Sequence, residues 1–69
     1  MVYELRFMEG GNLVETWNRT DFIPQIDTVV TLKDGTRYKV KALLIHRPSE
    51  DYLRLLSSVI VEVTITKEG

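Results

Sequence analysis

The chain has 69 residues, contains no cysteine, and carries nine basic and ten acidic side chains, for a formal net charge of −1. A chain of this length forms one small domain, residues 1–69, and it has no disulfide or cysteine-based zinc site to stabilise it. Because dedicated nucleic-acid binders usually show a clear positive excess, the charge balance counts against that class of protein.

No apolar run approaches the roughly 20 residues that cross a bilayer. The charged segment MVYELRF at the start of the sequence lacks the apolar stretch of a signal peptide. We therefore expect a soluble, cytoplasmic protein that is stabilised by the packing of its apolar side chains, which make up 43% of the residues.

Residues 2–8 alternate between apolar and polar side chains, which predicts a half-buried strand. The apolar side chains are those of Tyr3, Leu5 and Phe7. A glycine-rich turn over residues 9–12 and a second strand over residues 13–17 complete a first hairpin. Its register stays open at this point, because glycine-rich turns permit bulges.

The segment from Asn18 to Asp27 shows no period and predicts a connecting loop. Pro24 cannot donate a hydrogen bond to a strand ladder, which argues against a central strand here. Phe22 and Ile23 are too apolar for a free loop, so we expect at least one of them to pack against the core.

Asp34-Gly35 lies between two alternating segments, residues 28–33 and 36–46, and predicts a second hairpin with a tight two-residue turn. We expect four apolar side chains of this hairpin to face inward, namely Val30, Leu32, Tyr38 and Val40. Three basic side chains alternate with them and should face solvent, namely Arg37, Lys39 and Lys41.

Residues 42–45 are continuously apolar, so the strand is either buried on both faces or bent through a bulge. Residues 48–56 predict one or two helical turns, with a long loop as the alternative. Residues 58–66 are dominated by β-branched side chains and predict the last strand. The expected fold is mainly β: a five-stranded, curled antiparallel sheet closing into a small barrel, with a short helical insertion before the last strand.

Residues 23–32 and 34–40 combine a proline, a short turn, an aliphatic strand, Asp34-Gly35 and an aromatic-x-valine strand. In this, residues 23–46 resemble the opening segment of many SH3-like small barrels, and also short uncharacterised bacterial and phage proteins built around the same hairpin. Such barrels often have Gly-Asp before the strand, where this chain has Asp27 alone. The resemblance implies a fold and an accessory or assembly role, and it carries no catalytic residue.

The sequence lacks the residue patterns of common catalytic and metal sites. His46 is the single histidine, and no cysteine pair, calcium loop, phosphate loop or nucleophile elbow accompanies it. We therefore expect no enzymatic activity, no cofactor and no bound metal, and we interpret His46 as an ordinary residue at the end of a strand.

The candidate partner-binding residues are Trp17, Phe22, Tyr52, Leu53 and Leu56. Trp17 and Phe22 flank a polar loop, where an exposed tryptophan would act as a binding hot spot; the equal alternative is a tryptophan that caps the open end of the barrel. The leucines of the 48–56 insertion either mediate homodimerisation or form a lid over one barrel mouth. We thus expect a non-catalytic module that binds another protein or a second copy of itself.

The alternative function is a small nucleic-acid-binding barrel. Its binding residues would be the one local basic cluster, Lys33, Arg37, Lys39 and Lys41. The competing interpretation of this cluster is a solvated face whose basic groups pair with acids such as Glu62 on the neighbouring strand, contacts worth about 0–1 kcal/mol each.

Overall fold

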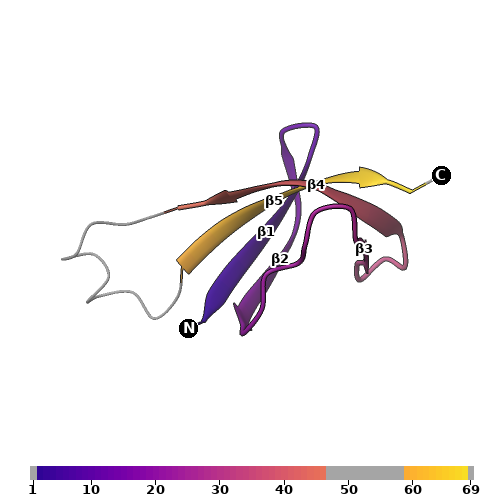
Figure 1. The fold of residues 1–69 in the computed structure, drawn as a ribbon. Helices are drawn as coiled ribbons and strands as arrows, with labels where there is room; N and C mark the ends of the chain where they lie inside the picture. Colours follow the sequence, from indigo (N-terminus) through magenta and orange to yellow (C-terminus); the bar gives the residue numbers. More distant parts are fainter. Residues whose placement is uncertain (1, 47–58, 69) are drawn as a thin grey trace.

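The computed structural model describes residues 2–46 and 59–68, which form one curled, five-stranded sheet without a helix (Figure 1). The strands are β1 (Tyr3–Glu9), β2 (Asn12–Thr20), β3 (Val29–Thr31), β4 (Arg37–Ile45) and β5 (Val59–Lys67). Their order across the sheet is β2-β1-β5-β4-β3, so the last strand lies in the middle and β2 and β3 form the two edges. The expected mainly-β class with five strands is confirmed.

The expectation of a wholly antiparallel sheet is wrong, because β1 and β5 run parallel, with Tyr3 opposite Val59 and Met8 opposite Thr64. The other three neighbouring pairs are antiparallel. Short hairpins impose antiparallel pairing on consecutive strands, whereas the direction of β5 is set by β4 and is independent of β1. The helical turns expected over residues 48–56 lie outside the described residues.

The first hairpin turns at Gly10 and Gly11, whose φ values are +56° and +83°. Positive φ at both positions is the requirement of the tight turn that matches the twist of two strands. Glu9 and Asn12 close the turn as the last pair of the ladder. The strand β2 continues to Thr20, beyond the predicted end at residue 17, and the register that the sequence left open contains two shifts against β1.

The second hairpin has a three-residue loop, residues 33–35, in place of the expected two-residue turn. Thr36 accepts the backbone N–H of Leu32 at 3.1 Å, and Leu32 accepts that of Gly35 at 2.9 Å. Gly35 has φ +82°, and Asp34 Oδ1 accepts the N–H of Thr36 at 2.9 Å. This pattern is a β-turn followed by a left-handed glycine, the usual three-residue solution.

The apolar run at the end of β4 is explained by a bulge. The register against β5 shifts between Val40 and Ala42, so Lys41 is the extra residue. Leu44 is 58% exposed, which excludes burial of the strand on both faces. The bulge bends β4, as expected for a strand in a sheet that curls.

The core lies on the concave face of the sheet. It is formed by alternate residues of β1, β4 and β5 and by the residue that follows β3, and the buried side chains are Leu5, Phe7, Leu32, Tyr38, Val40, Val61, Val63 and Ile65. The predicted inward-facing residues of both hairpins are therefore confirmed, with Val30 and Tyr3 partly buried beside the core. In the described part of the chain, no helix is long and apolar enough to span a membrane.

Candidate interaction surfaces

Trp17 lies at the margin of the core. Its ring packs edge-on against Phe7, with ring centroids 4.7 Å apart, and against Phe22 at 6.4 Å. The indole N–H donates to Glu15 Oε2 at 2.5 Å. Since edge-to-face aromatic contacts and a satisfied N–H both hold the ring in place, Trp17 is a fixed, partly buried side chain packed against the core.

Glu15 is a residue of this site that the sequence analysis did not identify. Its carboxylate accepts the Trp17 indole N–H through one oxygen and the backbone N–H of Lys33, at 2.9 Å, through the other. It thereby joins edge strand β2 to the turn that follows edge strand β3. In the sequence, Glu15 stands two residues before Trp17, so both side chains lie on the same face of a regular strand. A charged residue on the buried face of a strand was the signal that could have identified Glu15.

The loop between β2 and β3 presents apolar side chains on a fixed backbone. Ile23 packs against the core and Pro24 is buried, which confirms the expectation that part of this loop is anchored. Phe22 and Ile26 are 49% and 53% exposed. Asp27, at φ +73°, donates its N–H to Val40 O at 2.8 Å and ties the loop to β4. We call Trp17, Phe22 and Ile26 the loop surface.

The basic cluster of the second hairpin lies on β4 and in the turn before it. Arg37 forms an ion pair with Glu68 at 3.4 Å, and Lys39 lies opposite Thr66 on the outer, convex face. Lys41 occupies the bulge and is exposed, and Lys33 lies in the turn held by Glu15. The register shift against β5 begins after Val40, so Arg37 and Lys39 keep the expected alternation, and Lys41 is exposed like the Ala42 that follows it.

The acid that pairs with this cluster is Glu68, on Arg37, whereas Glu62, the example given above, lies opposite Leu44 and contacts His46. His46 Nε2 meets Glu62 Oε2, and the His46 backbone N–H donates to Ile60 O at 2.9 Å. Both bonds fasten the end of β4 to β5.

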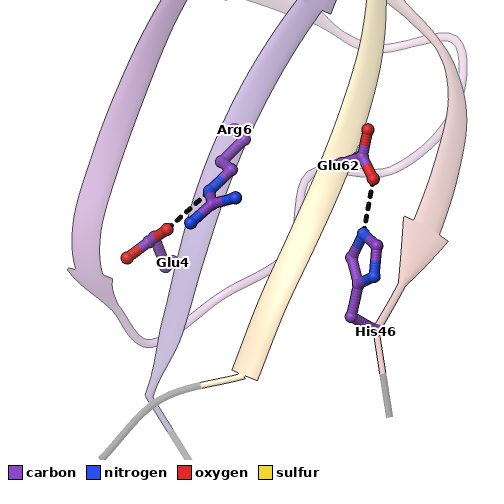
Figure 2. Close-up of polar contacts among 4 residues, drawn as sticks. All are labelled: Glu4, Arg6, His46 and Glu62. Atoms are coloured by element: carbon purple, nitrogen blue, oxygen red, sulfur yellow. Dashed lines mark hydrogen bonds and ion pairs between the residues drawn. The ribbon is translucent and has the colours of Figure 1, made fainter. Parts of the chain in front are cut away.

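A second polar pair lies beside this one on the same convex face. Arg6 Nε donates to Glu4 Oε2 at 2.6 Å on β1 (Figure 2). In register, Arg6 is the direct neighbour of Glu62 across the β1–β5 boundary. We call Glu4, Arg6, Glu62 and His46 the charged row; within residues 2–46 and 59–68, no three His, Cys, Asp or Glu side chains gather as metal ligands do.

The remaining predicted partner-binding residues, Tyr52, Leu53 and Leu56, lie outside the described residues, so the structure does not bring them together with Trp17 and Phe22. Comparison of the chain with models of protein families, with curated proteins and with solved structures finds no match. The resemblance of residues 23–46 to SH3-like barrels therefore stays a prediction.

Proposed function

We propose that this protein is a non-catalytic interaction module that binds another protein through the loop surface. The observation that carries the proposal is Phe22, an aromatic ring that is half exposed while its inner edge is held against Trp17. Aromatic side chains in fixed positions dominate the binding energy of protein interfaces, since little conformational freedom is lost when they are buried.

The backbone beneath these side chains is anchored at several points, which favours a preformed surface. Thr20 Oγ1 donates to Phe22 O at 3.3 Å, and Thr28 Oγ1 donates to Gln25 O at 2.6 Å. Ile26 therefore extends from a turn whose ends are both tied to strands. An accessory or assembly role in the cytoplasm of a bacterium, or in a phage, is the setting that the resemblance implies.

Photo-crosslinking in the source cells tests the proposal. A photoreactive residue replaces Phe22 in one variant and Leu44, on the convex face, in a matched control, because both native side chains are about half exposed. An adduct with a different protein from position 22, abolished by Ile26→Asp and absent from position 44, is the expected result; an adduct between two copies of this chain does not count. The proposal fails when position 22 yields no adduct or when Ile26→Asp leaves the adduct unchanged.

The alternative function, binding of nucleic acid by Lys33, Arg37, Lys39 and Lys41, has weaker support. Arg37 is already paired with Glu68. Phosphate contacts supply most of the affinity of such proteins, and four basic groups, one of them paired, on a chain of net charge −1 supply few of them.

A further inference from the structure

The convex face of the sheet carries charges of alternating sign across its two central strands. Alternate residues of β1 and β5 point away from the core, and these include Glu4, Arg6 and Glu62. Figure 2 shows the charged row crossing this face from β1 to the end of β4. Glu4 and Arg6 follow one another along β1, Glu62 lies beside Arg6 on β5, and His46 follows the end of β4 at the level of Ile60.

This order is complementary to itself. In the order across the sheet, β2 and β1 lie on one side of the β1–β5 boundary, and β5 and β4 lie on the other side. A twofold axis parallel to the strands, lying on the convex face above that boundary, sets β1 of one copy across β5 of the other. Arg6 then meets Glu62 of the second copy, and Glu4 lies beside His46 of the second copy. Isologous interfaces of this kind require one patch that fits itself.

The next row of side chains on the same face obeys the same symmetry. In register it contains Leu13, Met8, Thr64 and Ala42, from β2, β1, β5 and β4. Leu13 is 57% exposed, and Ala42 is exposed. The axis that pairs the charges places Met8 against Thr64 of the second copy, which adds a contact beside the polar ones, while Leu13 and Ala42 lie on the flanking strands.

We propose that the convex face mediates association between two copies of this chain, with the charged row at its centre. This inference goes beyond the loop surface, because Trp17 lies opposite core residue Leu5 and so belongs to the concave side. A net charge of −1 leaves little long-range repulsion between copies. Because a convex sheet touches its partner mainly along β1 and β5, the dimer is weak, and it dissociates as salt screens its exposed charges.

The decisive experiment uses two charge-reversal variants, Arg6→Glu and Glu62→Arg, in sedimentation equilibrium across the micromolar to millimolar range. In a homodimer of either variant, both symmetric contacts become repulsive, and we expect dimerisation to weaken by about tenfold or more. In an equimolar mixture, the substituted carboxylate at position 6 of one variant meets the substituted guanidinium at position 62 of the other. The second contact joins native Glu62 to native Arg6, so the mixture should associate although neither variant does so alone.

The control variants are Arg37→Glu and Glu68→Arg, which make the same charge changes at an ion pair at the opposite end of β4. We expect each to self-associate as the native chain does. Circular dichroism melts verify that all four variants are folded before they are compared. A native chain that stays monomeric throughout, or Arg6→Glu and Glu62→Arg variants that each dimerise as the native chain does, would overturn the proposal.

Discussion

The Glu15 carboxylate on β2 accepts the backbone N–H of Lys33 at 2.9 Å and so connects the two ends of the sheet. These ends are the opposite edges of a five-stranded order, and no β2–β3 ladder joins them in the described residues. In a complete barrel, backbone hydrogen bonds join the first and last strands of the sheet. Here the half-buried side chain of Glu15 joins the two edges instead.

We expect Glu15→Ala to lower the free energy of unfolding by about 0.5–1.5 kcal/mol, because it removes the acceptor of the part-buried Trp17 indole N–H, while water can replace it at the exposed Lys33 N–H. Glu15→Gln keeps one acceptor oxygen, so its loss should be smaller. Urea unfolding followed by tryptophan fluorescence measures both. Equal stability of the native chain and the alanine variant would show that the Glu15 carboxylate does not stabilise the contact between the two edges of the sheet.

Alternation along single strands was enough to predict the core. Leu5 and Phe7 of β1 and Val61 and Val63 of β5 are all fully buried, as their two-residue period indicates. The first hairpin was predictable for the same reason, since Gly10-Gly11 separates two alternating segments. The parallel pairing of β1 with β5 was not, because strands distant in sequence carry no local signal of relative direction.

The bulges are the reason why the sequence did not predict which side chains lie on each face of the sheet. A regular β2 would put Leu13 on the same face as Glu15 and Trp17. The ladder instead pairs Glu15 with inward-facing Phe7 and Leu13 with outward-facing Met8, because Val14 is an extra residue between them. One inserted residue moves every later side chain to the other face, and no residue type marks Val14 for that role.

The position of Trp17 predicts its spectroscopic behaviour. Its packing against Phe7 and Phe22 should give a blue-shifted emission with partial protection from acrylamide. Phe22→Ala removes the outer of these two rings, so we expect quenching to increase while the melting temperature changes little, because Phe22 is 49% exposed. Leu44→Ala, on the other face, is the matched control and should leave quenching unaltered. Full quencher access in the native chain is the contrary result.

Gly35 offers a test of the hairpin turn. Among residues other than glycine, mainly asparagine and aspartate adopt a φ as positive as its +82°. Open space surrounds the position that a Cβ atom would take. We therefore expect Gly35→Ala to cost about 1–2 kcal/mol of stability through backbone strain alone. Gly35→Asn should cost clearly less. Thermal unfolding of the two variants distinguishes them, and identical melting temperatures would mean that the turn adopts another conformation.

The interaction-module proposal predicts weak binding to nucleic acid. We expect fluorescence polarisation of a labelled single-stranded oligonucleotide to give only low affinity at physiological salt, because Arg37 is paired with Glu68 and the chain has a net charge of −1. The double variant Arg37→Glu with Lys39→Glu should then bind the protein partner as the native chain does, since neither residue belongs to the loop surface. Tight binding that falls steeply with ionic strength and disappears in this variant would instead establish the basic cluster as the functional surface.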